Sequence, residues 1–199
     1  SGYPNLVIVE SYDGTTWTET GDVNTTRQLA GCSAKAPAPT MLFFGGNPPA
    51  TTKTELFNGT SWTEVNDLNT TRDYSGGGAG GSSSALCVGG YGSPAAYLSK
   101  NESWDGTSWT EVGDLNSARY GGATGGTQSS ARCVAGAPPS GVGVSNEGWD
   151  GTTWSEQTEN SDNSAGRAGF GNSKDSFVVA GGNATAQTEF WNGSSWTEV

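Results

Sequence analysis

Five glutamates occupy the same place in a recurring motif, and their carboxylates are the first candidates for acid–base chemistry. Each lies seven residues before a tryptophan: Glu10, Glu55, Glu102, Glu147 and Glu189. Four arginines recur in register, ten residues after the first three of these tryptophans and thirteen after the fourth: Arg27, Arg72, Arg119 and Arg167. Glycoside hydrolysis needs two carboxylates at one place, and five equivalent carboxylates in a repeat cannot share one site. We therefore expect the glutamates to form structural ion pairs with the arginines.

Histidine is absent from the chain, which removes the commonest general base and the commonest transition-metal ligand. The three cysteines include no Cys-x-x-Cys pair. The Asp-x-Asp-x-Asp spacing of a calcium-binding loop does not occur either. We expect no metal site and no cofactor. Cys87 and Cys133 stand in the same register of successive repeats, so we interpret them as small core residues.

The motif that carries the glutamates predicts a β-hairpin. An aromatic residue, Asp-Gly or Asn-Gly, and a tryptophan follow each glutamate, and the hairpins contain all eight tryptophans. The hairpin tryptophans Trp17, Trp62, Trp109, Trp154 and Trp196 are 45, 47, 45 and 42 residues apart. Asn-Gly between alternating segments favours a two-residue turn, which sets Phe57 opposite Thr60. It makes Phe57 and Trp62 diagonal neighbours on one face.

Two further strands are expected between each arginine and the next glutamate. A Gly-, Ala- and Ser-rich segment follows the arginine, and then comes a short apolar run that ends in Gly-Gly at residues 45–46, 89–90 and 181–182. In the third copy this ending is Ala135-Gly136. Four short strands about every 45 residues are typical of a propeller blade.

This order of features resembles the kelch repeat over nearly the whole chain. An arginine is followed by an apolar run that ends in Gly-Gly, then by an aromatic residue with Asp-Gly or Asn-Gly, and then by a tryptophan. The resemblance implies an all-β fold, a β-propeller of four-stranded blades with about five blades. We expect residues 1–199 to form one such unit. Its half blade would lie at residues 1–20, and complete blades at about 24–66, 69–113, 116–158 and 164–199. The half blade lacks two inner strands, which favours a piece of a longer array over an unconventional closure.

Composition limits the partners. The net charge of −11 leaves no basic stripe for nucleic acid, and no stretch approaches the roughly 20 apolar residues of a membrane span. We expect neither nucleic-acid binding nor membrane insertion. Six Asn-x-Ser/Thr sequences follow from the Asn- and Thr-rich repeats and do not establish glycosylation.

The loops between the second and third strands vary most in length, and variable loops on a rigid scaffold are the usual binding surface. They should emerge on one face of a propeller. The candidates in them are Tyr91, Tyr97, Pro48, Pro49, Pro138 and Pro139. Aromatic residues are favoured contact anchors, although local packing over the blade would also explain the two tyrosines.

Function follows from these residues only in outline. The turn at residues 11–17 resembles the Asp-box of sialidases, but sialidases need converging arginines, and four of the five here recur in blade register. A galactose-oxidase-like copper site needs histidines and is excluded. We expect a non-enzymatic binding or structural propeller, extracellular or virion-associated, similar to repeat proteins on the appendages of bacterial viruses. Its partner would be a protein or glycan on a surface, or other chains of the same assembly. The alternative is a carbohydrate-binding lectin or a sialidase-like glycosidase relative.

Overall fold

The computed structural model describes residues 7–33, 40–75, 78–94, 96–137, 145–161, 166–182 and 186–199. Within these ranges the chain consists of β-strands joined by turns and contains no helix, so the all-β prediction is confirmed. A helix able to cross a membrane is therefore also absent from these ranges. The strands form six antiparallel sheets, of which four have four strands each.

Each four-stranded sheet comes from one repeat unit, and its strands lie side by side in chain order. The first contains β3 (Gly31–Cys32), β4 (Met41–Phe44), β5 (Thr54–Phe57) and β6 (Trp62–Val65). The second contains β8 (Gly78–Gly81), β9 (Ser84–Val88), β12 (Asn101–Trp104) and β13 (Trp109–Val112). The third contains β14 (Ala123–Thr127), β15 (Ser130–Val134), β16 (Asn146–Trp149) and β17 (Trp154–Glu156). The fourth contains β18 (Ala168–Ser173), β19 (Ser176–Ala180), β20 (Thr188–Trp191) and β21 (Trp196–Glu198).

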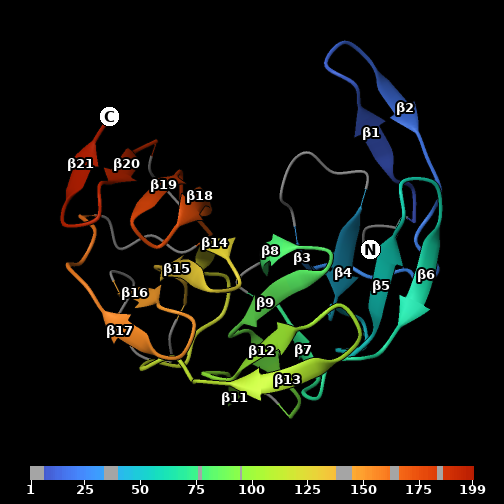
Figure 1. Ribbon diagram of the computed structural model, residues 1–199, viewed down its shortest axis with the longest axis horizontal. Coiled ribbons are helices and arrows are strands. Elements are labelled where there is room, and N and C mark those ends of the chain that lie inside the picture. The colour runs from blue at the N-terminus through green and yellow to red at the C-terminus, as the bar shows by residue number, and fades with distance from the viewer. Residues whose placement is uncertain are drawn as a thin grey trace.

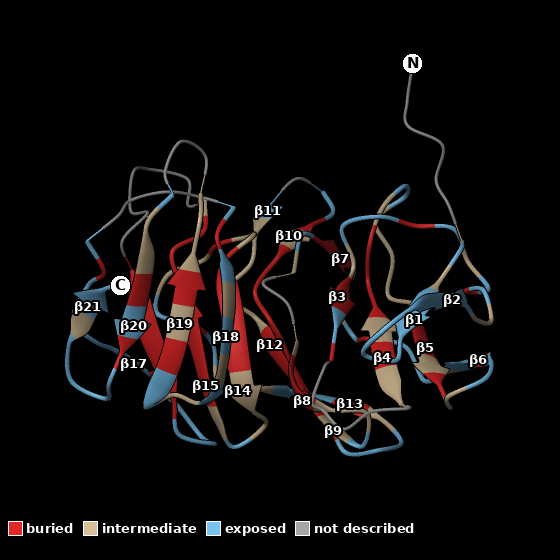
Figure 2. Cartoon of the chain, turned by 90° about the horizontal axis from the view of Figure 1, so that it is seen from above, coloured by how far each residue is buried: buried red, intermediate tan, exposed pale blue. Residues whose placement is uncertain are grey.

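The sheets follow one another around an arc, with β14 between β8 and β18 on its inner side (Figure 1). Two smaller sheets complete the structure. One is the hairpin of β1 (Glu10–Tyr12) and β2 (Trp17–Glu19), at the blue end of the arc. The other joins β7 (Arg72–Asp73), β10 (Tyr91–Gly92) and β11 (Ala96–Tyr97), which lie together at one end of the strands (Figure 2).

The hairpin register differs from the predicted one. Phe57 lies directly opposite Trp62, and Leu56 lies opposite Thr63, so the loop has four residues and not two. The side chain of Asn58 explains the wider loop, because its Oδ1 accepts the backbone N–H groups of Thr60 and Ser61 at 2.9 and 3.0 Å. The predicted two-residue turn and diagonal pairing are therefore wrong.

The aromatic contacts themselves are present in all five hairpins. The ring centroids of each pair are 5.0 to 5.4 Å apart, and the rings are tilted. In the four-stranded sheets most of these rings are buried, and the core forms between neighbouring sheets. Cys87 and Cys133 lie in this core as expected. Burial raises the pKa of the Cys87 thiol to about 11, so this thiol remains protonated and unreactive near neutral pH.

Glycines in the inner strands permit close approach between sheets. A Cβ atom on Gly169 would lie 2.7 Å from the Cβ of Ala123 and 2.8 Å from the Phe177 ring. A Cβ atom on Gly125 would lie 2.9 Å from the same ring. The glycines that follow Arg119 and Arg167 are therefore required by the packing of β14 against β18.

The departure from Gly-Gly in the third unit leaves a strained alanine. Ala135 keeps the left-handed backbone of its glycine counterparts, with φ of 56°, compared with 55° at Gly89 and 64° at Gly45. Only glycine adopts this conformation without a steric penalty. The backbone geometry of the repeat thus persists where the sequence motif is lost.

We expect Ala135→Gly to stabilise the fold by about 0.5–1 kcal/mol, because relief of the left-handed penalty exceeds the added chain entropy of glycine. Gly89→Ala, at the equivalent position, should destabilise it, since its Cβ would lie 2.7 Å from the Arg119 carbonyl oxygen. Urea unfolding followed by circular dichroism measures both. A less stable Ala135→Gly protein would contradict the assignment of strain.

Candidate binding face

Each four-stranded sheet contains one buried arginine–glutamate pair. The pairs are Arg27–Glu55, Arg72–Glu102, Arg119–Glu147 and Arg167–Glu189, with N–O distances of 2.5 to 3.0 Å. All eight side chains are at most 3% exposed. The expected ion pairs are therefore present for four of the five repeat glutamates, and they occupy those carboxylates. Glu10 has no arginine partner among the described residues, so the expectation is wrong for it.

The Arg72 guanidinium shows what such a pair connects. Its Nη2 donates to Glu102 at 2.7 Å, and its Nη1 donates to the carbonyl oxygens of Gly89 and Lys100, also at 2.7 Å. Gly89 follows β9 and Lys100 precedes β12. One guanidinium thus links the segment before the first strand to the second and third strands of its sheet.

An asparagine three residues before the arginine completes this network. Asn69 donates to Glu102 through its backbone N–H at 2.7 Å and through Nδ2 at 3.0 Å, and Nδ2 also donates to the Trp109 carbonyl at 2.8 Å. Asn24 and Asn116 make the same contacts in the first and third sheets. Sequence reasoning missed this role, although the repeated Asn-Thr/Ser-x-Arg spacing was the available signal.

We expect Glu102→Gln to destabilise the protein by about 3–5 kcal/mol, because it leaves the buried Arg72 charge without its partner. The matched control is Glu111→Gln, which breaks the exposed Lys100–Glu111 pair; this change should cost at most about 1 kcal/mol. Chemical denaturation gives both values. Equal effects of the two substitutions would contradict a structural role for the buried pair.

The fourth pair also predicts a pH dependence. Burial raises the pKa of the Glu189 carboxyl, but hydrogen bonds from Arg167 and Ser161 outweigh burial and hold this pKa below its usual range. A carboxyl with a lowered folded-state pKa stabilises the fold above its unfolded pKa, and this stability is lost as the pH falls through the folded pKa.

The free energy of unfolding of the native chain should therefore decrease as the pH falls below about 4.3, the usual pKa of glutamate. The decrease should be smaller in Glu189→Gln, which has no carboxyl to protonate at this position. Urea unfolding at pH 7, 5, 4 and 3 measures both. Parallel pH profiles of the two proteins would contradict the expectation.

Four tyrosines gather at one end of the second and third sheets: Tyr74, Tyr91, Tyr97 and Tyr120. Tyr97 stacks on Tyr120 at 5.5 Å with a 30° angle between the rings. Tyr91 meets both rings edge to face at 5.7 and 5.8 Å, and Tyr74 meets Tyr120 at 5.2 Å. We call this group the tyrosine cluster. Sequence reasoning named Tyr91 and Tyr97 but missed Tyr74 and Tyr120, which follow the repeat arginines by two residues and one.

Short backbone pairings hold the cluster in place. Tyr91 lies opposite Tyr97 on one side and Asp73 on the other, so the predicted loop contains strands β10 and β11. Gly121 donates its N–H to the Tyr74 carbonyl at 3.0 Å, which connects the second unit to the third. Tyr74 has a φ of 45° and is 41% exposed. A bulky residue in this backbone region is uncommon and marks a strained position.

Buried acceptors lie next to Tyr74 in the sequence. Asp73 is 3% exposed and accepts a hydrogen bond from Asn47 through Oδ2. Its Oδ1 and the Oγ of Ser75 have no hydrogen-bond partner among the described residues. Unpaired buried polar atoms are costly, and they are found where a ligand or an ordered water completes the site.

The proline candidates divide into two pairs. Pro48 and Pro49 lie in the turn after β4, next to Asn47, which contacts Asp73. Pro138 and Pro139 lie outside the described residues. The first pair therefore flanks the segment that carries the buried acceptors.

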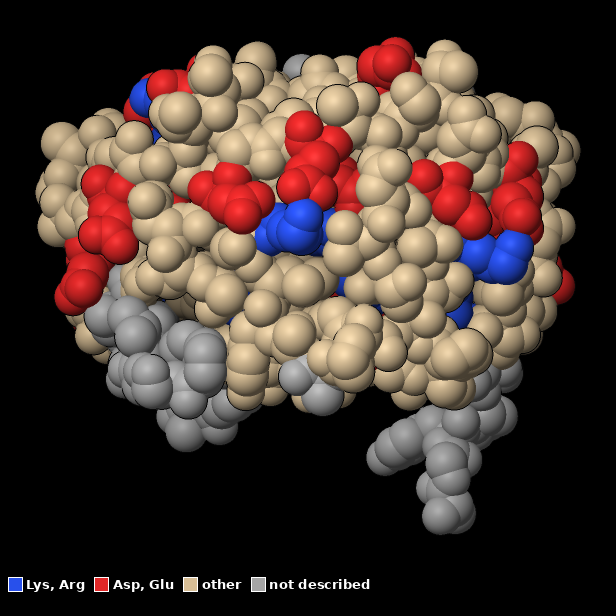
Figure 3. All heavy atoms as spheres, turned by 90° about the horizontal axis from the view of Figure 1, so that it is seen from below, with Lys and Arg blue, Asp and Glu red and all other residues tan. Residues whose placement is uncertain are grey.

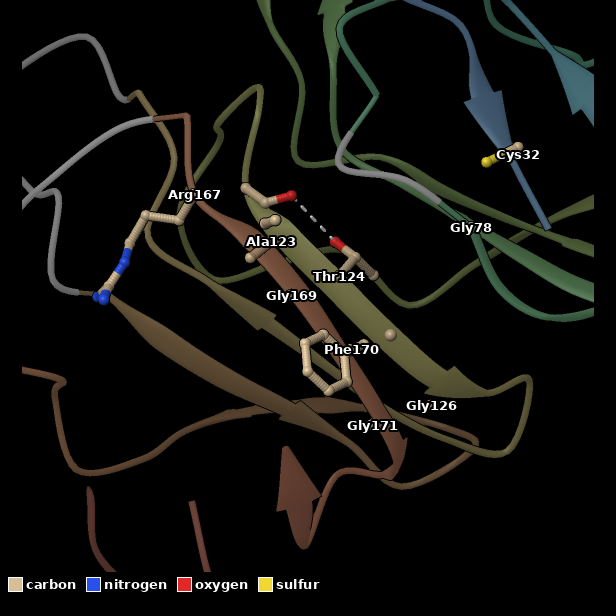
Figure 4. Close-up of a pocket in the computed structure, with 12 residues that line it drawn as sticks. Cys32, Gly78, Ala123, Thr124, Gly126, Arg167, Gly169, Phe170 and Gly171 are labelled. Carbon is tan, nitrogen blue, oxygen red and sulfur yellow. Dashed lines mark hydrogen bonds between the residues drawn. The ribbon is translucent and has the colours of Figure 1, made fainter. Parts of the chain in front are cut away.

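A second hollow lies on the inner side of the arc, where β3, β8, β14 and β18 face a cavity of about 390 Å³. Cys32 lies across the cavity from Arg167 and Phe170 (Figure 4). Most of the remaining lining is glycine, and Arg167 is already paired with Glu189. The cavity is large enough for a small ligand, but few polar side chains in its lining are free to take part in catalysis.

All five arginines have structural partners. Four are in the pairs described above, and Arg132 lies over the Trp191 ring at 4.2 Å and donates to the Lys174 carbonyl at 2.6 Å. They do not form the converging cluster that a sialidase site needs. In the part of the chain that the structure describes, no group of three or more Cys, Asp and Glu side chains could hold a metal ion.

Acidic residues gather on the outer surface. The outer strands each carry an exposed glutamate two residues after the tryptophan: Glu19, Glu64, Glu111, Glu156 and Glu198. Asp and Glu side chains form a band across one flank, with a few basic side chains beside it (Figure 3). Lys53 and Lys100 pair with two of these glutamates. The band favours solubility and disfavours contact with polyanions.

Comparison with known proteins adds no family to these observations: no protein-family model and no curated protein matches the chain.

Proposed function

We propose that the chain is a kelch-like β-propeller of about five blades that serves as a non-enzymatic binding or structural module. Four-stranded sheets in chain order, arranged in an arc around a central cavity, support the propeller. The recurring arginine, Gly-Gly and tryptophan support the kelch type. In this proposal residues 1–199 form one unit, with complete blades at about 24–66, 69–113, 116–158 and 164–199.

The tyrosine cluster is the observation that carries the binding role. Tyrosine gives a large, rigid contact area with a polar tip, and it is enriched among residues that dominate binding energy. Here four rings from two adjacent repeat units meet at one end, and Tyr74 is exposed in a strained conformation. The ion pairs that engage Glu55, Glu102, Glu147 and Glu189, and the partners of all five arginines, support a role without catalysis.

The partner in this proposal is a protein or glycan on a surface, and the location is extracellular or on a virion. Near-identical Asn-, Gly-, Ser- and Thr-rich hairpins support this placement by their likeness to the appendage proteins of bacterial viruses. A lectin is the second candidate. The exposed side chain of Tyr74 favours it, because its hydroxyl can exchange hydrogen bonds with sugar hydroxyls.

A glycan array and a binding assay on whole bacterial cells, both with fluorescently labelled protein, test the proposal. We expect Tyr74→Ala and Tyr97→Ala to weaken binding at least about tenfold, as truncation of an anchoring aromatic residue typically does. Phe190→Ala, at an exposed aromatic residue of β20, is the matched control and should bind like the native chain.

If the tyrosine variants keep the melting temperature of the native chain, their weaker binding reflects lost contacts with the partner and not loss of folding. Binding on the array without binding to protein-coated surfaces would support the lectin. Undiminished binding of both tyrosine variants would contradict the assignment of the face. Hydrolysis of a sialoside by the native chain would contradict a non-enzymatic role.

A further inference from the structure

Among the described residues, the β1–β2 hairpin lacks the neighbouring strand that the four equivalent hairpins have. In the four-stranded sheets, the strand that carries the glutamate lies between two others, as β12 lies between β9 and β13. β1 pairs with β2 alone among the described residues. The free edge of β1 presents unpaired backbone groups, which makes it a template for another strand.

The side chains of this hairpin are exposed where their equivalents are buried. Tyr12 and Trp17 are 54% and 67% exposed, compared with 9% and 7% for Phe57 and Trp62 in the next hairpin. Ile8 is 53% exposed as well. An exposed patch of this kind on a regular hairpin marks a surface for association.

Glu10 is the counterpart of the four paired glutamates, yet no arginine pairs with it in the described residues. Its side chain is exposed, whereas Glu55, Glu102, Glu147 and Glu189 are at most 1% exposed. In the complete sheets the partner arginine enters with the inner strand pair, as Arg119 enters before β14 and β15. The exposed carboxylate of Glu10 is complementary in charge to an arginine at the equivalent position of a further strand pair.

A cavity of about 320 Å³ lies beside the free edge, lined by Val9, Glu10 and Tyr12 of the hairpin and by Met41 and Phe57 of the first sheet. Its lining combines apolar side chains with the free carboxylate. It therefore provides space next to β1, together with apolar and acidic contacts for a strand.

We propose that the edge of β1 binds an arginine-bearing antiparallel strand pair from outside residues 7–199. The donated pair is of the type that precedes the third strand in each complete sheet: its second strand pairs with β1, and its arginine pairs with Glu10. The four such pairs that the structure describes are already built into their own sheets, so none of them is free to fill the edge. This surface is separate from the tyrosine cluster and does not depend on the binding proposed there.

A peptide of residues 114–137 is the probe, because it contains Asn116, Arg119, β14 and β15. Labelled peptide is titrated with the full chain under reducing conditions, and fluorescence anisotropy gives the dissociation constant. Hydrogen exchange of residues 7–12 shows whether the edge of β1 becomes protected. We expect saturable binding together with protection of these amides.

The ion pair gives the specific readout. Glu10→Gln in the protein and Arg119→Ala in the peptide should each weaken binding by about tenfold or more, and the two changes together should weaken it little further. Glu19→Gln, which removes an exposed glutamate opposite Glu10 on β2, is the matched control and should leave affinity unchanged. Equal affinities of the native and Arg119→Ala peptides would overturn the proposal.

Fusing residues 114–137 to the N-terminus of the chain tests the same pairing without relying on the affinity of a free peptide. In the third unit, nine residues separate Ala137 from Glu147, and residues 1–9 provide the same separation from Glu10 when 114–137 precedes Ser1 directly. The fused strand pair should slow exchange at residues 10–12 and raise the melting temperature, and Glu10→Gln should reverse most of that rise. Exchange as fast as in the unfused chain would overturn the proposal. So would dimers of the native chain that protect β1 without any peptide, since they would assign the edge to a second copy.

Discussion

The buried link between arginine, glutamate and asparagine is the interaction on which the rest of the structure depends. A lone charge in a protein interior is very unfavourable, and a buried pair is tolerated only when hydrogen bonds satisfy its remaining atoms. Here the carboxylate accepts from the guanidinium and from the backbone and side chain of asparagine, while the guanidinium donates to two further carbonyls. The ion pair recurs in all four sheets and the asparagine contacts recur in three of them, because the alternative is an uncompensated charge. The link therefore fixes where each sheet begins relative to its third strand.

Once this link is in place, the other repeated residues follow from packing. In three units the guanidinium donates to the carbonyl of the residue after the second strand, and the left-handed backbone at Gly89, Ala135 and Gly181 provides the sharp turn there. The paired aromatic rings fill the space between one sheet and the next, and tryptophan indoles connect the sheets directly, as Trp109 Nε1 donates to Thr54 Oγ1 at 3.0 Å. The glycines of β14 and β18 let the inner strands approach closely. A short motif can thus specify an arc of sheets without a large hydrophobic core.

The sequence predicted this architecture well because the determinants are local and repeated. Four strands per unit, buried cysteines and the pairing of glutamates with arginines could all be derived from spacing. The hairpin register could not, since Asn-Gly is compatible with a two-residue turn and with the four-residue loop that the Asn58 side chain closes. The roles of Asn69 and its equivalents were hidden by composition, because asparagine is common in these repeats. Only two of the four tyrosines in the cluster were predicted. Tyr74 and Tyr120 join Tyr97 through contacts between units, which no single repeat encodes.

The repeat also determines where variation can appear. A position that takes part in the ion-pair link or the aromatic packing is constrained in every unit, so functional differences must lie at positions that the link leaves free. Residues one and two places after the arginine are such positions: they are Gln28 and Leu29, Asp73 and Tyr74, and Tyr120 and Gly121 in successive units. Their backbone connects neighbouring units through Tyr74 N–H to Leu29 and Gly121 N–H to Tyr74, while their side chains differ in size and polarity. The same scaffold therefore holds a leucine, a tyrosine and a glycine in one left-handed conformation at one end of the arc. Because the scaffold supplies the geometry, these side chains can differ between units without loss of the fold, which is what the proposed binding role of Tyr74 and Tyr120 requires.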